Sequence, residues 1–373
     1  MADNNENKVL NVPHLRFPEF SGEWKRVELK DVAEFQKSRI PADSLDASCY
    51  ISTENLIPNF GGIKEASSIP TDGNVMAIKP NDILISNIRP YLKKVWQSDR
   101  FGGCSADVFV LRTTRCQSDF LYNIIASDKF INYAMSGAKG VKMPRGDKRQ
   151  MEEFEFSIPA IEEQNRISRL LSLLDERIAT QNKIIDKLQS LIKGLRNKIF
   201  GKLRKNVGFN AMIGDVLGYE QPQSYIVEDT EYVDEGTPVL TANKAFVLGY
   251  TSETEGIYDK GDCIIFDDFT LDCKYVDFPF KVKSSAIKIL TAENKELLRY
   301  TFEFLKYLDL STDEHKRHYI AETQNQEFIL PTTQIVRTIS HTFSVLSLRM
   351  ETVIKQRLLF EKQKQYLLRQ MFI

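Results

Sequence analysis

The chain has 373 residues, of which 42% are hydrophobic and 27% are charged, and its formal net charge is −1. This length suits two domains of ~150 residues better than one, and the composition excludes disordered and collagen-like classes. We expect a cytoplasmic protein, because the sequence shows neither a secretory leader pattern nor an apolar run of the ~18 residues that a membrane helix needs. The five cysteines form no CxxC pair, which predicts reduced thiols rather than disulfides or a zinc site.

A short arm, residues 1–20, precedes the first predicted globular block, residues 21–157. In this block KPNDILIS (79–86) predicts a turn followed by a short β-branched strand, and CSADVFVL (104–111) predicts a second strand. The run FLYNIIASDKFINYAM (120–135) has helical character. Mixed strands and short helices of this kind are typical of an α+β domain.

Two polar segments of this block are candidates for binding nucleic acid. The loop GAKGVKMPRGDKRQ (137–150) combines glycines, which let the backbone approach a phosphate, with five cations that neutralise phosphate charge. The run SNIRPYLKK (86–94) follows a strand end and offers arginine for guanine and asparagine for adenine. The alternatives are an ordinary solvated loop for the first segment and a core position for Tyr91 in the second.

Residues 158–205 predict one long helix, which begins near Pro159 in the phrase IPAIEEQNRIS. The segment carries 11 Lys and Arg against five Asp and Glu, a net charge of +6. Apolar residues recur at steps of three and four, which predicts a coiled-coil seam interrupted at Gln181. The seam residues are Leu171, Leu174, Ile178, Ile185, Leu188, Ile192, Leu195 and Ile199.

The second globular block, residues 206–329, repeats the first in outline. IGDV (213–216) resembles LKDV (29–32), DKGDCIIF (259–266) resembles the first turn and strand, and KSSAIKIL (283–290) resembles the second strand. This block ends in the helical run ELLRYTFEFLKYL (296–308). Unlike the first block it is acidic, with 11 Lys and Arg against 23 Asp and Glu, a net charge of −12.

Residues 330–373 predict a second long helix, which begins LPTTQIVRTIS and matches the first at a constant offset of 172 positions. The matches include Pro159 with Pro331, Ser168 with Ser340, and Phe200 with Phe372. This segment has a net charge of +5, from seven Lys and Arg against two Glu. Its seam, with Arg357 and Lys364 as polar interruptions, consists of Phe343, Leu346, Met350, Val353, Phe360, Leu367 and Met371.

The duplication predicts the architecture: two mixed α/β domains of α+β class, related by a pseudo-twofold axis and separated by the two long helices. A narrow two-per-seven seam favours another helix as its partner, and a twofold axis makes the helices an antiparallel intramolecular coiled coil. In the alternatives, each stripe packs separately against its own domain, or a helix mediates oligomerisation.

The chain resembles the specificity subunits of type I restriction–modification systems. The resemblance rests on VPHLRFPEFSGEWKRVELKDV (12–32), ISNIRPYLKKV (85–95) and SIPAIEEQNRIS (157–168), and it extends over essentially the whole chain. The second half departs from the pattern, because PTTQIV stands in place of PAIEEQ. The resemblance therefore implies no role for a glutamate–glutamine pair in the second half.

This resemblance implies that each globular block is a target recognition domain that reads one half of a split site in double-stranded DNA. The long helices act as a spacer and dock two methyltransferase subunits, which join two motor–nuclease (restriction) subunits. The subunit itself performs no chemistry and carries no cofactor; S-adenosylmethionine, ATP and Mg belong to the partner subunits.

The candidate DNA-contacting residues are the polar and basic side chains of the loops described above and of their counterparts in the second block. In the first block they are Lys37, Arg39, Asn87, Arg89, Tyr91, Lys93, Lys94, Lys139, Lys142, Arg145, Lys148 and Arg149. In the second they are Asn243, Lys244, Lys274, Lys316, Arg317 and His318. The acidic stretch Asp267–Lys274, aligned with the basic run of the first block, is the main physical objection to a DNA interface there, because carboxylates repel phosphate.

We find no catalytic or metal-binding constellation in the sequence. Neither a Walker sequence nor a Gly-x-Gly cofactor loop is present, and the four histidines lack the spacing of a metal site. The leading hypothesis is therefore a non-catalytic DNA-recognition subunit. A coiled-coil scaffold for protein partners, without DNA specificity, is the alternative, and an intrinsic nuclease built on Asp259 and Asp272-Cys-Lys274 is a more distant one.

Overall fold

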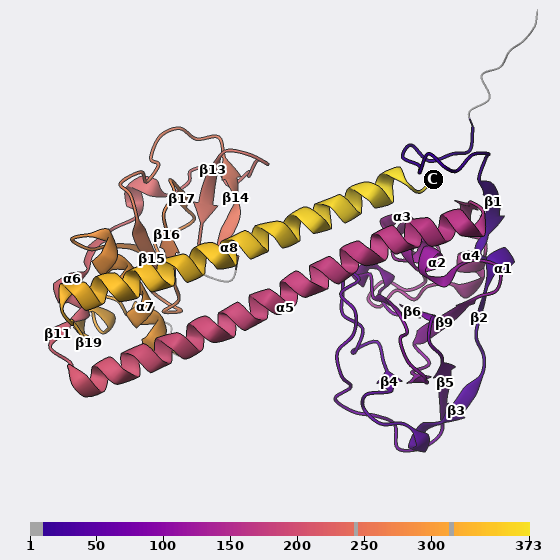
Figure 1. Ribbon diagram of the computed structural model, residues 1–373, viewed down its shortest axis with the longest axis horizontal. Helices are drawn as coiled ribbons and strands as arrows, with labels where there is room; N and C mark the ends of the chain where they lie inside the picture. Colours follow the sequence, from indigo (N-terminus) through magenta and orange to yellow (C-terminus); the bar gives the residue numbers. More distant parts are fainter. Residues whose placement is uncertain (1–9, 242–244, 313–316) are drawn as a thin grey trace, which may run out of the picture. The chain divides into compact units, whose positions relative to one another are not determined.

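A computed structural model describes residues 10–241, 245–312 and 317–373. The chain divides into two compact units. Unit 1 comprises Met1–Ala179 with Arg357–Ile373, and unit 2 comprises Thr180–Gln356. Each unit therefore contains a globular body and a segment of both long helices, α5 (Ile161–Asn206) and α8 (Thr333–Gln370) (Figure 1).

Within its described residues, unit 1 has three sheets. The first is the antiparallel pair β1 (Lys25–Glu28) and β10 (Glu155–Ile158). The second has the order β2 (Ala33–Phe35), β9 (Val108–Thr113), β6 (Ile83–Ser86) and β7 (Val95–Gln97), with all neighbours antiparallel. The third has the order β3 (Arg39–Pro41), β5 (Asn74–Ile78), β8 (Gly102–Cys104) and β4 (Tyr50–Ile51), in which β4 and β8 are parallel.

The helices of this body are short and capped by polar side chains. They are α1 (Leu29–Val32), α2 (Ser118–Ile125), α3 (Asp128–Ser136) and α4 (Lys148–Glu152), with single 3₁₀ turns at Ala42–Ser44 (η1) and Pro90–Leu92 (η2). The Gln117 side chain accepts a 2.6 Å hydrogen bond from the Phe120 amide at the start of α2. Asp147 likewise accepts from the Arg149 amide at the start of α4, which satisfies donors that a helix start leaves unpaired.

The β6 strand separates two of the apolar clusters of this body, because successive side chains point to opposite faces of a sheet. Ile83 and Ile85 pack with Phe120 and the other apolar residues of α2 and α3. Leu84 faces the third sheet and packs with Ile78. All four β6 residues are buried, as expected for the central part of a covered sheet.

Unit 2 repeats this plan. Its described residues contain β11 (Ala211–Met212) with β19 (Glu327–Phe328), a sheet ordered β12 (Gly218–Glu220), β18 (Ile287–Thr291), β15 (Cys263–Asp267), β16 (Cys273–Val276), and a sheet ordered β14 (Val247–Thr251), β13 (Thr237–Leu240), β17 (Lys281–Val282). Its helices are α6 (Ile213–Val216) and α7 (Lys295–Leu308), with 3₁₀ turns at Gln223–Tyr225 (η3) and Thr323–Asn325 (η4).

The sequence echoes correspond to equivalent elements. The strand order β2-β9-β6-β7 has its counterpart in β12-β18-β15-β16. LKDV and IGDV form α1 and α6, and in each the third-residue aspartate accepts a hydrogen bond from the amide that precedes the helix: Asp31 from Glu28 (2.9 Å) and Asp215 from Met212 (2.8 Å). The prediction of a mixed α/β chain with two long helices is confirmed.

The two long helices run antiparallel wherever they meet inside one unit. In unit 1 the Lys364 ammonium lies 2.6 Å from the Asp175 carboxylate, and the Arg177 guanidinium covers the Phe360 ring. In unit 2 the Arg196 guanidinium covers the Phe343 ring. Every predicted seam residue of both helices is buried or half-buried, as a coiled-coil seam requires.

Phe200 and Phe372, which occupy matching positions near the ends of the two helices, both anchor a helix end in a globular body. In unit 2 the Phe200 ring is fully buried and lies about 5.4 Å from those of Tyr300 and Phe304. In unit 1 the Phe372 ring stacks on Phe120 at 5.1 Å. The repeated phenylalanine therefore has the same packing role in each unit.

The glutamate–glutamine pair present only in the first repeat fastens the segment before β1. Arg16 donates two hydrogen bonds of 2.7 Å to the Glu163 carboxylate, which is buried and also accepts from the Trp24 indole at 3.3 Å. Gln164 accepts from the Gln117 amide at 2.9 Å. In the second repeat, Val336 at the position matching Gln164 joins the apolar core instead.

Candidate nucleic-acid interface

Two predicted DNA-binding segments, distant in sequence, lie against each other in unit 1. The connection between β6 and β7 contacts the loop that follows α3 through backbone hydrogen bonds. The Arg89 amide donates to the Pro144 carbonyl at 2.8 Å, and the Gly146 amide donates to the Asn87 carbonyl at 3.0 Å. The basic run and the basic loop therefore form a single surface, which we call the loop junction (residues 86–94 and 137–150).

The backbone of the loop junction is locally strained. Arg89 and Lys93 flank η2 with φ of 50° and 54°, the left-handed region that is unfavourable for side chains of this size. Arg89 Nε and Asn87 Oδ1 are buried and have no hydrogen-bond partner among the described residues. Strained backbone and unsatisfied polar atoms concentrate at functional sites, because a ligand or substrate interaction offsets their cost.

The loop after α3 is closed at its base and open at its tip. Lys139 and Arg145 exchange two backbone hydrogen bonds of 2.9 Å. Their side chains form ion pairs, Lys139 with Asp147 and Arg145 with Asp107, each at 2.8 Å. The hydrogen bond from Lys139 and those from nearby amides hold the pKa of Asp147 below its usual range. Both cations are therefore partly neutralised by the protein itself.

The other cations of the loop junction differ in their accessibility. Lys142 and Arg149 are exposed and form no ion pair with described residues. The Lys148 ammonium lies 4.9 Å from the centre of the Phe35 ring and 5.6 Å from that of Phe109, and burial lowers its pKa. Lys148 therefore covers apolar surface, and Lys142 and Arg149 are the better candidates for phosphate contacts.

In the β6–β7 connection, Tyr91 is 48% exposed, so the core position considered for it does not occur. Lys93 pairs with Asp128 at 2.7 Å, and the Lys94 ammonium donates to the Thr53 carbonyl. Burial also lowers the pKa of Lys94. Lys37 and Arg39 are exposed near the start of β3, and neither forms an ion pair with a described residue.

In unit 2 the stretch aligned with the basic run is not an acidic surface. Asp267 accepts hydrogen bonds from the Phe269 and Thr270 amides. Asp268 is 1% exposed and accepts from the amides of His318 and Tyr319 at 3.0 and 2.7 Å. These carboxylates organise their own loops, so the expected repulsion of phosphate by this pair of aspartates is removed by folding.

Asp272 is neutralised in a different way, by two lysines. Its carboxylate contacts Lys306 at 2.6 Å and Lys274 at 3.3 Å. Burial opposes its ionisation, but the hydrogen bond from Lys306 and the charges of both lysines outweigh that effect, so its pKa is lowered. Lys274 is consequently engaged within the protein.

The remaining predicted DNA-binding residues of unit 2 differ in their exposure to solvent. Arg317 is exposed, whereas the His318 ring is buried and its Nδ1 lies 2.8 Å from Glu322. That burial indicates a structural role for His318, which connects the segment after α7 to the β15–β16 loop. Asn243, Lys244 and Lys316 lie outside the described residues.

Sequence reasoning missed several contributors to the loop junction. Asp107 anchors Arg145, and its carbonyl accepts a hydrogen bond from the Asn87 amide at 2.8 Å. Val141 and Met143, at the tip of the loop, are exposed although they are apolar. Asp107 contacts residues about 20 and 40 positions away, so local sequence carries no signal for it, but apolar residues within a basic glycine-rich loop were a visible anomaly.

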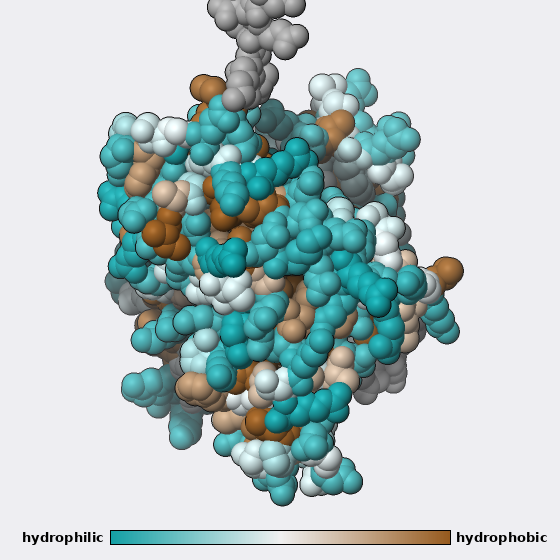
Figure 2. All heavy atoms as spheres, turned by 90° about the vertical axis from the view of Figure 1, so that its right-hand side faces the viewer, coloured by the Kyte–Doolittle hydropathy of each residue, from teal (hydrophilic) through white to brown (hydrophobic). Residues whose placement is uncertain are grey.

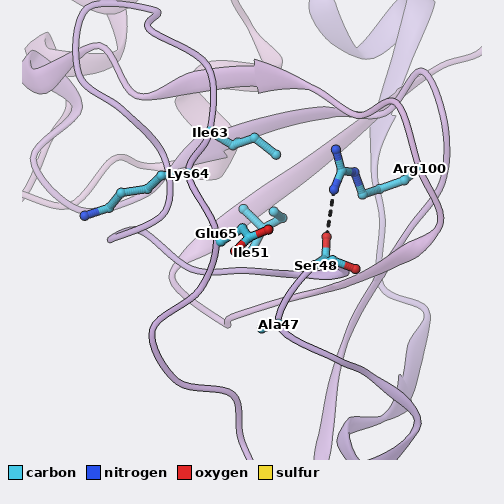
Figure 3. A pocket seen from close by; sticks show the side chains of 7 residues that line it. All are labelled: Ala47, Ser48, Ile51, Ile63, Lys64, Glu65 and Arg100. Atoms are coloured by element: carbon cyan, nitrogen blue, oxygen red, sulfur yellow. Dashed lines mark hydrogen bonds between the residues drawn. The ribbon is translucent and has the colours of Figure 1, made fainter. Parts of the chain in front are cut away.

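Unit 1 also has two shallow hollows beside its third sheet. One of about 210 Å³ is lined by Ser48, Lys64, Glu65 and Arg100, and Arg100 donates a 2.8 Å hydrogen bond to the Ser48 carbonyl (Figure 3). The other measures about 270 Å³. Both are smaller than the ~300–1,000 Å³ typical of small-molecule sites. An extended ligand lying on the surface suits this unit better than a small enclosed one.

Three further properties of the described residues concern the polarity of the surface, possible metal ligands and helix hydropathy. The face in Figure 2 is mostly hydrophilic, with apolar side chains in small separate groups. Within residues 10–241, 245–312 and 317–373, no three His, Cys, Asp or Glu side chains are grouped to hold a metal ion. No helix in this described part has the length and apolar character needed to span a bilayer.

Comparison with known proteins agrees with this picture. The family model described as Type I restriction modification DNA specificity domain matches residues 21–190. The EcoR124I/EcoR124II specificity subunit of Escherichia coli is 46% identical over 126 residues, which is 32% of this chain and 31% of that protein. The MjaVIII specificity subunit of Methanocaldococcus jannaschii is 27% identical over 202 residues, which is 53% of this chain and 46% of that protein.

The sequence alignments thus span about a third to a half of these relatives. The fold similarity is more extensive. The crystal structure of the S subunit of a type I restriction-modification system from M. genitalium has a TM-score of 0.68 and covers 97% of this chain and 99% of its own, at 16% identity. Residues 21–190 therefore match a type I restriction–modification DNA specificity domain, and the described chain shares the fold of the M. genitalium S subunit.

Proposed function

We propose that this chain is the DNA sequence-recognition subunit of a type I restriction–modification complex, and that each unit reads one half of a bipartite site in double-stranded DNA. The observation that carries the proposal is the loop junction of unit 1, which lies within the matched specificity domain. It combines exposed Lys142 and Arg149 with a strained backbone and with unsatisfied Asn87 and Arg89 atoms. Cations position a duplex and polar side chains read base edges.

The chain contributes recognition and geometry to this function, and no catalytic step. We assign methylation and DNA cleavage to two methyltransferase subunits and two restriction subunits, which bring S-adenosylmethionine, ATP and Mg. Exposed apolar residues on the long helices favour docking of these partners: Leu348 is 65% exposed and Leu359 is 64% exposed. Large apolar side chains exposed on a rigid helix suit a protein interface.

The first test compares the methylated sequences of the host's DNA with and without this gene. We expect one split motif, two short half-sites separated by unread positions, to lose methylation completely when the gene is deleted. Restoring the wild-type gene should restore the motif. A methylome that is the same in both strains would contradict the proposal.

A protein-interaction scaffold without DNA specificity is the second candidate, and the exposed apolar residues of the helices favour it. The two functions differ in their response to salt. The affinity of a DNA reader assembled with its methyltransferase subunit falls steeply with ionic strength, because phosphate contacts release counterions. Assembly through apolar helix faces changes little with salt. If the assembled chain binds no DNA even at low salt, the scaffold function is favoured.

The second test concerns the helices as a spacer. The 46 residues of α5 correspond to about 69 Å of helix, and one inserted heptad adds about 10.5 Å while preserving the seam register. The insertions belong between Ala179 and Thr180 and between Gln356 and Arg357, where the helices pass from one unit to the other. We expect the unread gap of the motif to lengthen by about three base pairs, at about 3.4 Å per base pair.

The half-sites themselves should stay unchanged in this variant, because neither globular body is altered. A heptad inserted in α5 alone is the matched control. It puts the two seams out of register and should abolish methylation of any split motif with a fixed gap. If the double insertion methylates the original motif with its original gap, the helices do not set the spacing.

A further inference from the structure

The tip of the loop after α3 is apolar, although the loop as a whole is basic. Val141 is completely exposed and Met143 is 48% exposed, with Lys142 between them. Gly140, at φ of 95°, turns the chain into this tip. Burying exposed apolar side chains against apolar groups is favourable, so these residues favour a ligand that has apolar groups.

The base of the loop is held firmly, so the tip has a defined position. The paired hydrogen bonds between Lys139 and Arg145 form a single β-bridge that closes the loop at its base. The Arg145 side chain is tied to Asp107, and Arg145 is also bridged to Ile88 on its other side. A Cβ atom at Gly146 would lie 2.4 Å from the Met151 methyl group, so a side chain there would require the buried Met151 side chain to shift.

The chemistry of the tip fits the major groove of DNA. That groove is about 12 Å wide and admits a two-stranded ribbon. Thymine presents its C5-methyl group there, the principal apolar feature on a base edge, and apolar side chains recognise it. Lys139 and Arg145, which sequence alone suggested as DNA contacts, are engaged in ion pairs at the base, so the tip is the part of the loop free to reach base edges.

We propose that Val141 and Met143 are specificity-determining residues that enter the major groove and contact the methyl group of a thymine in the half-site read by unit 1. This inference rests on the proposed function. Lys142, between them, faces a phosphate or a neighbouring base edge from the same tip. The tip thereby supplies apolar readout, and the β6–β7 connection supplies polar readout from the adjacent surface.

The test uses the full chain assembled with the methyltransferase subunit of its host and a duplex that carries the selected motif. Each thymine of the motif is replaced in turn by deoxyuridine, which lacks only the methyl group. We expect one or two replacements in a single half-site to weaken wild-type binding about fourfold, the effect of losing one buried methyl-sized group. With Val141→Ser or Met143→Gln, the same replacements should have no further effect, since the contact is already lost.

The exposed apolar residue Leu10, in the same unit and 57% exposed, provides the matched control. Leu10→Ser should keep the full deoxyuridine effect. Val141 contacts solvent on all sides, so Val141→Ser leaves the melting temperature unchanged, and a measured melting curve verifies this.

Three outcomes would overturn the proposal, and they are distinguishable. If no sequence is selected by the wild-type complex, the proposed function fails and the tip assignment with it. If a motif is selected but every deoxyuridine replacement affects wild-type and tip variants equally, only the tip assignment fails. The tip assignment also fails if the half-site contains no A·T pair and the tip variants leave the affinity of the complex unchanged.

Discussion

Replacing Glu303 with alanine is expected to lower the free energy of unfolding of unit 2 by about 3–5 kcal/mol, the cost of leaving buried charges without their partner. Glu303, on α7, is 1% exposed. It accepts two hydrogen bonds from Arg196 of α5, at 2.9 and 2.7 Å, and one from Arg299 at 2.9 Å. Arg299 also donates to the Phe343 carbonyl of α8 at 3.3 Å, so the network of Arg196, Glu303 and Arg299 connects α7 to both long helices.

Hydrogen exchange of the α7 amides measures this loss within unit 2, which a global melting curve of a two-unit chain does not. The control is Glu296→Ala, an exposed glutamate in the first turn of the same helix, which should change the opening free energy by less than about 0.5 kcal/mol. Replacing Arg196, Arg299 and Glu303 together with apolar residues of similar size should recover most of the stability. Equal exchange rates in wild type and Glu303→Ala would disprove the role of the network.

The corresponding substitution in unit 1, Glu163→Ala, should destabilise the segment before β1 by about 3–5 kcal/mol. The carboxylate is 1% exposed and accepts two hydrogen bonds from the Arg16 guanidinium, whose pKa the hydrogen bond to Glu163 raises. Its loss leaves the mostly buried Arg16 without its carboxylate partner, although Arg16 keeps hydrogen bonds to the Ser21 and Gly22 carbonyls. The Trp24 indole loses its acceptor as well. The segment from Asn11 to Trp24 should then become the first site of proteolytic cleavage.

Limited proteolysis followed by mass measurement detects that cleavage directly. Glu162→Ala provides a matched control, since Glu162 belongs to the same helical turn and is exposed. Both variants remove one negative charge from the first turn of α5, so any difference between them arises from the Arg16 contact. Cleavage elsewhere first, or at the same rate in both variants, would contradict the anchoring role of Glu163.

The repeated architecture was predictable because it is written in local patterns. A two-per-seven apolar stripe specifies a long helix and its buried face, and the seam from Leu171 to Met371 is buried or half-buried as that pattern requires. The turn-strand segments at 79–86 and 259–266 likewise formed equivalent elements, β6 and β15. Periodicity and turn chemistry act over a few residues, so a single sequence reveals them.

The electrostatic details of the site were not predictable in the same way, because they depend on contacts between distant residues. The sequence predicted an acidic surface at Asp267 and Asp268. In the structure Asp267 accepts a hydrogen bond from the nearby Phe269 amide, and Asp268 accepts one from the His318 amide in the segment after α7. The Arg299–Glu303 spacing of four was visible, but only the tertiary structure buries the pair against α5 and α8. Charge counted along a sequence overstates what is presented to a ligand wherever folding pairs the charges internally.

The composition of unit 1 has a consequence for how the protein is made. Its apolar core includes Leu367 and Met371, which belong to the same unit as Trp24 although more than 300 positions separate them in the chain. A ribosome synthesises a chain in order at about 5–20 residues per second. Part of the apolar surface around Phe120 therefore remains uncovered for roughly ten seconds or more, until Leu367 and Met371 have been synthesised. The globular part of unit 2 emerges later but needs only Thr180–Gln356. The unit begun first is therefore completed last, and its apolar core stays partly uncovered throughout synthesis.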